Sequence, residues 1–231
     1  MTTMNHRQIV WLKAAMWAAC FLPLLRLGYL GFTGGLGANP IEFITLSTGT
    51  WTLVLLLSTL AITPLRVITG QNWLVKLRRL VGLFAFFYGC LHFLTYVWLD
   101  QFFDFPAMMR DVAKRPFITM GFTAFSILIP LAVTSTTGAI RRLSGRRWRR
   151  LHRLIYISAI AAVIHFWWKV KADVRQPEIF AAVLALLLGF RILIWAREKF
   201  QSAPKRKLQG GEPVPGAVEA IGSGMQQNSD L

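Results

Sequence analysis

Acidic residues, histidines and cysteines are scarce in this sequence, which has ten Asp and Glu against 26 Lys and Arg, four His and two Cys. The apolar runs carry almost no acid, which excludes a dinuclear carboxylate site in a helical bundle. A zinc site would need more Cys or His in one cluster. Cys20 and Cys90 lie in apolar segments without a CxxC motif, so we expect small buried hydrophobic residues. Ser-His-Asp, HExxH and phosphate-loop patterns are also missing, which excludes the corresponding hydrolases and nucleotide-binding proteins.

Hydrophobic residues, in contrast, are abundant. They make up 55% of the chain, with nine Trp, 17 Phe and a mean hydropathy of +0.48, which is typical of membrane proteins. The formal charge of +16 would favour nucleic-acid binding in a soluble protein. Here the basic residues cluster between apolar runs, as the positive-inside rule predicts, so we favour a membrane protein. The first run, Val10–Leu30, is too long for a signal-peptide core and contains Lys13 and Arg26.

Six apolar runs are each long enough to cross a hydrocarbon core of about 30 Å, which needs about 20 helical residues. The sequence therefore predicts an all-α fold, an integral membrane six-helix bundle. The expected spans are Val10–Leu30, Phe43–Ile62, Leu80–Leu99, Pro116–Ser135, Leu151–Trp168 and Ile179–Trp195.

Loop charges predict the orientation of these spans. The links before Leu80 and over residues 136–153 carry basic residues and no acid, whereas Asp100–Arg115 and Lys169–Glu178 mix both signs. Both termini should therefore be cytoplasmic. We expect a cytoplasmic N-terminus over residues 1–9, a membrane domain over 10–200 and a disordered tail over 201–231, which is rich in Gly, Pro, Ser and Gln. Aromatic residues in Asp100–Arg115 indicate an interfacial segment.

Two histidines are candidates for binding a metal cofactor. His92 lies 13 residues after Arg79 in the third span, and His165 lies 15 residues after Arg150 in the fifth span. These spans should run parallel, because one full hairpin separates them, so the two imidazoles can face each other at similar depth. A histidine within the membrane is a functional hypothesis by default. Two opposed imidazoles between helices suit b-type heme.

His152 is a third candidate, at the basic end of the fifth span. It precedes His165 by 13 residues, about 20 Å along a helix and about 140° around it, so the two cannot bind one iron. They would share a face only if the helix bends or His152 lies in an irregular first turn. His152 could bind a second heme near the inner surface, or pair with a propionate or a flavin phosphate there.

The sequence resembles the ferric-reductase-like transmembrane superfamily, and within it the MsrQ family, over roughly residues 7 to 200. MsrQ proteins are the heme-binding membrane subunits of the bacterial periplasmic protein-methionine-sulfoxide reductase system. The threonine–serine stretch at 134–137 and a set of short motifs carry this resemblance. The motifs are WLK at 11–13, GxLGANPIE at 34–42, TPLR at 63–66, RRLVGL at 78–83, LHFLTY at 91–96, RPFITMG at 115–121, RRWRRLHRLIYI at 146–157 and IHFWWKVK at 164–171.

The resemblance implies heme b bound by His92, His152 and His165, a bound flavin mononucleotide (FMN), and a location in the bacterial inner membrane. It further implies electrons drawn from the quinone pool or a cytoplasmic flavin reductase. Their recipient would be a periplasmic molybdenum-containing reductase that repairs oxidised methionines. This chain would then conduct electrons, and the substrate chemistry would occur in the partner subunit.

Two other functions are weighed against this one. Ferric reductases and NADPH oxidases of the superfamily carry a fused flavin and nicotinamide domain, but only 36 residues follow Trp195, fewer than the roughly 40 that fold alone. We therefore expect an external reductant, with a stand-alone metal or quinone reductase as the nearest alternative. A small proton-coupled transporter with His92 or His165 in a proton relay is more distant, because no pair of broken repeat helices is evident.

Overall fold

The computed structural model describes residues 4–201, and all the regular secondary structure in that part of the chain is helical, as predicted. The chain divides into two compact units, residues 1–193 and 194–231, and the helical bundle belongs to the first. Of the predicted tail over residues 201–231, all but the first residue lies outside the described part. The elements are α1 (His6–Phe32), α2 (Pro40–Thr69), η1 (Asn72–Leu74), α3 (Val75–Leu94), η2 (Thr95–Asp100), α4 (Phe105–Lys114), α5 (Pro116–Val133), α6 (Thr137–Leu151), α7 (Leu154–Lys169) and α8 (Arg175–Gln201).

Five stretches of helix within residues 4–201 are long and apolar enough to cross a membrane. A sixth is reached if α6 and α7, which are bent by 45° at the break between them, form one span. The helix α7 itself has only 16 residues, fewer than the roughly 20 that a bilayer core needs. The predicted number of six spans therefore depends on whether α6 and α7 cross together.

Capping residues mark the ends of α2 and the start of α4. The side chain of Asn39 accepts a hydrogen bond from the backbone N–H of Glu42 at 3.3 Å, and Pro40 starts α2 with a φ that already suits a helix. Gly70 ends α2 in a left-handed conformation, with φ of 68°. The carboxylate of Asp104 accepts the N–H of Ala107 at 2.9 Å and so caps α4. These signals fix where each helix turns back.

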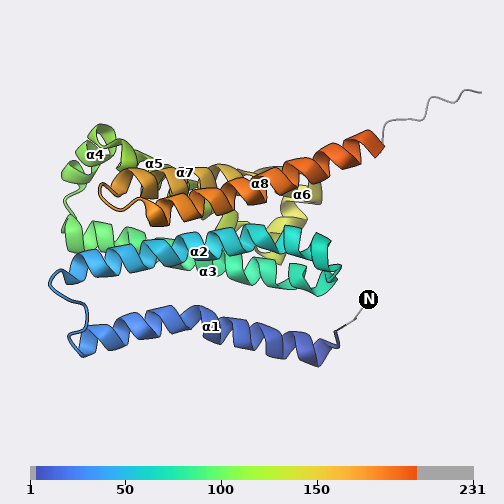
Figure 1. The fold of residues 1–231 in the computed structure, drawn as a ribbon, viewed down its shortest axis with the longest axis horizontal. Helices are drawn as coiled ribbons and strands as arrows, with labels where there is room; N and C mark the ends of the chain where they lie inside the picture. The colour runs from blue at the N-terminus through green and yellow to red at the C-terminus, as the bar shows by residue number, and fades with distance from the viewer. Residues whose placement is uncertain (1–3, 202–231) are drawn as a thin grey trace, which may run out of the picture. The chain divides into compact units, whose positions relative to one another are not determined.

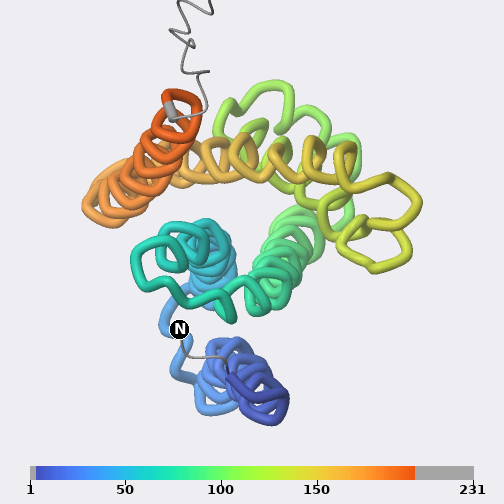
Figure 2. The backbone as a smooth tube through the Cα atoms, turned by 90° about the vertical axis from the view of Figure 1, so that its right-hand side faces the viewer, coloured from blue at the N-terminus to red at the C-terminus, as the bar shows by residue number. Residues whose placement is uncertain are grey.

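The helices α1, α2, α3, α5 and α7 run alternately in opposite directions, so α3 and α7 point the same way (Figure 1). The two most extensive helix contacts join α2 to α3 and α5 to α7, and further contacts between α3 and α5 connect the two pairs. Figure 2 shows α1 beside the hairpin of α2 and α3, against which it makes smaller contacts. This arrangement brings the third and fifth predicted spans into one bundle.

The core of the bundle follows the helical period. Along α3 the buried side chains include Leu77, Val81, Phe84 and Tyr88, three or four residues apart on one face. The hydroxyl of Tyr88 donates a hydrogen bond to the backbone carbonyl of Cys20 on α1 at 2.8 Å. Because lipid tails are as apolar as these side chains, van der Waals packing and such interhelical hydrogen bonds hold the helices together.

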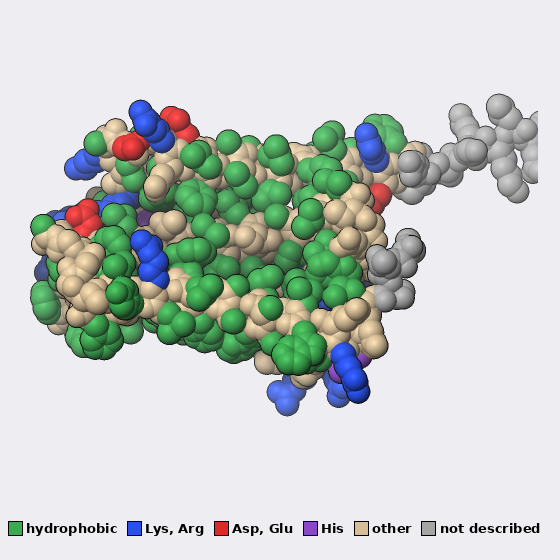
Figure 3. Space-filling model, turned by 60° about the horizontal axis from the view of Figure 1, so that its bottom comes forward, with side chains coloured by type: hydrophobic (Ala, Val, Ile, Leu, Met, Phe, Trp, Pro, Cys, Tyr) green, Lys and Arg blue, Asp and Glu red, His purple; other side chains and the backbone are tan. Residues whose placement is uncertain are grey.

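Apolar side chains also cover much of the outside. Hydrophobic groups occupy the middle of the face drawn in Figure 3, and charged groups gather towards its two ends. Large hydrophobic residues remain exposed along α1, including Trp11, Leu25 and Phe32. A soluble monomer rarely shows so extensive an apolar surface, whereas a membrane protein presents it to lipid.

The predicted interfacial segment contains the amphipathic helix α4. Met108 is buried against the bundle, whereas Phe105 and Met109 are exposed. Just before α4, Phe102 and Phe103 have positive φ values of 46° and 64°, a backbone region that residues other than glycine rarely adopt. Aromatic residues at the end of two long helices are typical of a membrane–water interface.

Candidate functional site

His92 on α3 and His165 on α7 face each other in the bundle. Their ring centroids are 6.0 Å apart, and the ring planes make an angle of 72°. The structure thus brings together the two histidines whose matching depths in the sequence indicated a pair.

The ring of His92 is oriented from α2. Its Nδ1 lies 3.0 Å from the backbone carbonyl oxygen of Thr45. A carbonyl oxygen only accepts hydrogen bonds, so Nδ1 carries the proton and Nε2 keeps a free lone pair. The hydroxyl of Thr95 donates to the carbonyl of His92 at 2.7 Å and lies 3.4 Å from the hydroxyl of Thr45.

The ring of His165 is held in the same way from α5. Its Nδ1 lies 2.6 Å from the backbone carbonyl oxygen of Phe117. The same argument places the proton on Nδ1 and leaves the Nε2 lone pair free. Metal-binding histidines are usually fixed by such a bond from the second ring nitrogen. Both rings are therefore prepared to offer Nε2 to a metal.

Glycines on α2 and α5 make room for these rings. A Cβ atom built at Gly49 would lie 3.0 Å from Cε1 of His92, and one built at Gly121 would lie 2.7 Å from Nδ1 of His165. Real Cβ contacts are rarely so short, so only glycine fits here without a shift of the imidazole. Each imidazole thus occupies the space that a side chain at Gly49 or Gly121 would otherwise fill.

The histidine pair supplies two ligands and no more. Among residues 4–201 there is no group of three or more His, Cys, Asp or Glu side chains able to hold a metal ion. A zinc ion would need four ligands. A metal that brings its own equatorial ligands needs only two, one from each side. With metal–nitrogen bonds of about 2.0 Å, two imidazoles sharing one metal have ring centres on the order of 6 Å apart, close to the observed separation.

His152 lies elsewhere, at the break between α6 and α7. Its Nε2 is 3.1 Å from the hydroxyl oxygen of Thr134, and its ring stacks on Trp148 with centroids 4.0 Å apart. The indole N–H of Trp148 donates to the backbone carbonyl of Thr134 at 3.0 Å. The helix is irregular here, which meets one of the two conditions for His152 to share a face with His165. The structure does not bring His152 to the pair formed by His92 and His165.

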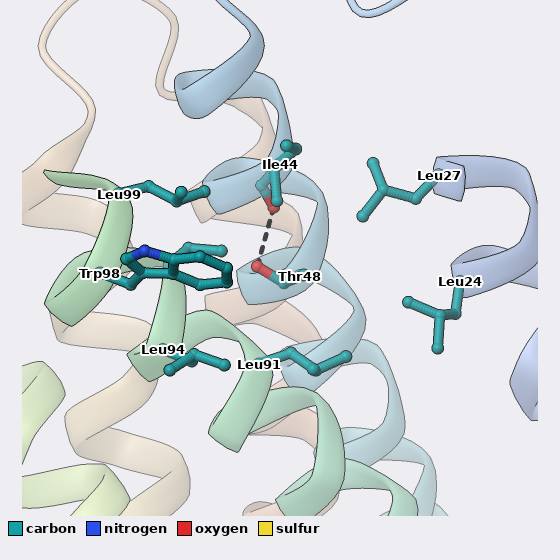
Figure 4. A pocket seen from close by; sticks show the side chains of 9 residues that line it. Leu24, Leu27, Ile44, Thr48, Leu91, Leu94, Trp98 and Leu99 are labelled. Carbon is teal, nitrogen blue, oxygen red and sulfur yellow. Dashed lines mark hydrogen bonds between the residues drawn. The ribbon is translucent and has the colours of Figure 1, made fainter. Parts of the chain in front are cut away.

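Two pockets are lined by residues that contact the histidine pair, Phe117 in one and Thr95 in the other, although neither histidine lines them. An open pocket of ≈ 310 Å³ is lined by Pro116, Phe117 and Trp168, so the residue whose carbonyl contacts His165 also reaches the surface. A second pocket of ≈ 170 Å³ lies between α1, α2 and the end of α3, where leucines from α1 and α3 face Thr48 and Trp98 (Figure 4). The Thr48 hydroxyl is already bonded to the carbonyl of Ile44 at 2.8 Å, so this pocket suits an apolar group.

Sequence reasoning missed the groups that orient the two rings. The carbonyls of Thr45 and Phe117 leave no trace in a sequence, because every residue has one. Gly49 and Gly121 were visible as glycines inside apolar spans, where small residues often mark a close helix contact. The sequence could not indicate that both contacts are with histidine rings, since that depends on how the helices are rotated.

Comparisons with known proteins show the family of this chain. The family model described as "Ferric reductase like transmembrane component" matches residues 46–163, which include His92 and His152 and end two residues before His165. A protein of Herminiimonas arsenicoxydans is 54% identical over 194 residues, which are 83% of this chain and 88% of that protein. Proteins of Ralstonia nicotianae and Bordetella pertussis are 54% and 53% identical, over 78% and 85% of this chain and 84% and 96% of their own lengths. All three are named "Protein-methionine-sulfoxide reductase heme-binding subunit MsrQ".

Proposed function

The chain belongs to the MsrQ family within the ferric-reductase-like transmembrane proteins, and from that membership we propose that it carries electrons through heme b across the bacterial inner membrane. Its multi-pass location there follows from the family and from the five or six apolar helices. The electrons go to a periplasmic molybdenum-containing reductase that repairs oxidised methionines, and the substrate chemistry belongs to that partner.

The facing pair of His92 and His165 is the observation that carries this proposal. The ring separation of 6.0 Å suits one iron between the two imidazoles. The carbonyls of Thr45 and Phe117 hold both Nδ1 protons away from the iron, and so leave Nε2 as the ligand. Heme, when bound, supplies an iron that cycles between its ferric and ferrous states.

The protein's own residues control the environment of that iron. Apolar side chains exclude water from the bundle, and excluding water is one of the levers that set a heme potential. The carbonyls of Thr45 and Phe117 accept hydrogen bonds from Nδ1–H and so raise the basicity of the two histidines, which would favour the ferric state of a bound heme. Both histidines lie within helices of the bundle, so the protein would hold these two ligands in place in either oxidation state of the iron.

The outward end of the electron path lies near α4 and α5. The ring of Phe117 is 6.1 Å from that of His165, centroid to centroid, and Phe117 also lines an open pocket. Two ion pairs, Asp111 with Arg115 and Asp173 with Arg175, lie in the loops of mixed charge. These loops are periplasmic in the proposed topology, with both termini cytoplasmic, so the partner reductase has access to this end.

The inward end lies near the break between α6 and α7. We assign to His152 a second heme near the cytoplasmic surface; a contact to a propionate or a flavin phosphate is the alternative role. Seven arginines between positions 141 and 153, with no acid among them, favour a cytoplasmic location for this end and suit the anionic FMN. The donor is then the quinone pool or a cytoplasmic flavin reductase.

A reduced-minus-oxidised absorption spectrum of the detergent-purified protein tests this function. We expect b-type bands in the wild type, and we expect His92→Ala and His165→Ala to lose the signal of the heme between them. His6→Ala is the matched control, because His6 is exposed at the start of α1. A folded wild-type protein without a Soret band, after expression with ample heme, would reject the cytochrome and favour the proton-coupled transporter.

The partner requires a separate experiment. Dithionite-reduced protein should be reoxidised by the periplasmic reductase in the presence of methionine sulfoxide, and not by the reductase alone. Rapid reoxidation by ferric chelates or quinones, without the partner, would instead support a stand-alone metal or quinone reductase.

A further inference from the structure

The same local arrangement occurs twice around the histidine pair. On α2, the carbonyl of Thr45 receives Nδ1 of His92, and Gly49 follows four residues later on the same face. On α5, the carbonyl of Phe117 receives Nδ1 of His165, and Gly121 again follows four residues later. Residues four apart lie one above the other on a helix, so each imidazole rests over one carbonyl and the glycine above it.

We propose that Gly49 and Gly121 are positioning residues that fix how the imidazoles of His92 and His165 would be presented to a heme iron held between them. This inference rests on the proposed heme function and adds two residues to it. Each glycine lets an imidazole approach its helix closely enough for Nδ1–H to reach the carbonyl. The depth of that approach fixes how far Nε2 projects towards the opposite ring.

An added methyl group would act on the iron through the histidine. At Gly121 a Cβ would lie 2.7 Å from Nδ1 and 2.9 Å from Cε1 of His165, so the ring must move. At Gly49 the nearest contact would be 3.0 Å, so a shift of a few tenths of an ångström suffices. Moving the ring would lengthen the hydrogen bond from Nδ1–H to the carbonyl oxygen. It would also change the direction in which Nε2 points. Gly121→Ala should therefore have the larger effect.

The alternative is that these glycines only allow close helix packing, as small residues often do in membranes. Gly89 on α3 separates the two explanations. A Cβ there would meet Phe125 and Thr52 at 3.6 Å, an ordinary contact in the same bundle with no histidine involved. Gly89→Ala is therefore the matched control for a glycine at a helix contact.

The test compares Gly49→Ala, Gly121→Ala, Gly89→Ala and the wild type by electron paramagnetic resonance of the ferric protein and by a redox titration of the b-type band. We expect both histidine-contacting variants to gain a high-spin ferric signal, to shift in midpoint potential and to retain heme about tenfold less tightly or worse. Gly89→Ala should match the wild type in all three measurements.

Three results would overturn the inference. The first is wild-type spectra and potentials in folded Gly49→Ala and Gly121→Ala. The second is an equal change in Gly89→Ala, and the third is failure of both variants to accumulate, since either would indicate general packing. If only Gly121→Ala fails to fold, the milder Gly49→Ala carries the test. A wild-type protein without a low-spin b-type signal would instead reject the proposed function, so the two failures are distinguishable.

Discussion

Nε2 of His152 lies 3.1 Å from the hydroxyl oxygen of Thr134, at the break between α6 and α7. This ring nitrogen is therefore in contact with a side chain at the end of α5, while Trp148 stacks on the ring. His92 and His165, in contrast, direct Nδ1 to backbone carbonyls and keep Nε2 free. The three histidines thus form one prepared pair and one separate residue.

His152→Ala should lower the heme-to-protein ratio by one equivalent and leave the low-spin signal of the His92 and His165 site intact. The reason is the separation of the two sites: His165 follows His152 by thirteen residues, about 20 Å along a helix. A pyridine hemochrome assay on protein of known concentration measures the ratio. An unchanged ratio would mean that His152 contacts a propionate or a flavin phosphate instead.

Tyr88→Phe should lower the free energy of unfolding by about 1 kcal/mol, because it removes the buried hydrogen bond to the carbonyl of Cys20. This bond ties α1 to α3, so its loss should also make the thiol of Cys20, now 5% exposed, react faster with a maleimide. Thermal unfolding in detergent and thiol labelling measure the two effects. Tyr29→Phe is the control, since Tyr29 lies on α1, the helix of Cys20, and its side chain is exposed. Equal behaviour of the two variants would contradict the prediction.

Gly70→Ala should destabilise the protein by about 1 kcal/mol, whereas Gly70→Asn should cost less. Gly70 ends α2 with φ of 68°, a conformation that Ala adopts at a steric cost and Asn tolerates better. A Cβ at Gly70 meets no atom within 4 Å, so the backbone conformation alone causes the loss. The midpoint of thermal unfolding is the measurement. A Gly70→Ala variant more stable than the Gly70→Asn variant would exclude this explanation.

The long apolar helices could be predicted because hydrophobicity alone defines them. Val10–Leu30 and Phe43–Ile62 both fall inside longer helices, since a bilayer tolerates few other structures. The pairing of His92 with His165 was also predictable, because similar distances from the basic ends of parallel spans, 13 and 15 residues, give similar depth.

The shorter helices were harder to predict. The helix α4 has charged residues in its last turn, and α6 contains six of the seven arginines between positions 141 and 153, so neither resembles an apolar span. The break at His152 was foreseen only as one of two conditions. The contacts of Gly49 and Gly121 with the histidine rings depend on the rotation of α2 and α5, which a hydrophobic pattern does not fix.

The number of spans determines on which side of the membrane the residues after α7 lie. Six spans place Met109 and Ala172 on the periplasmic side and Gly138 on the cytoplasmic side. If α6 and α7 form a re-entrant pair instead of one bent span, Ala172 stays cytoplasmic.

Single cysteines at Met109, Gly138 and Ala172 test this in a background with Cys20→Ala and Cys90→Ala. An impermeant maleimide applied to intact spheroplasts should label Met109→Cys and Ala172→Cys, and should label Gly138→Cys only after lysis. Met109 and Ala172 are exposed, so burial does not limit the reaction. Labelling at Met109 without labelling at Ala172 would leave five spans. It would also place the C-terminus outside, away from a cytoplasmic donor, and so would remove the topological basis for electron transfer from the inner to the outer side.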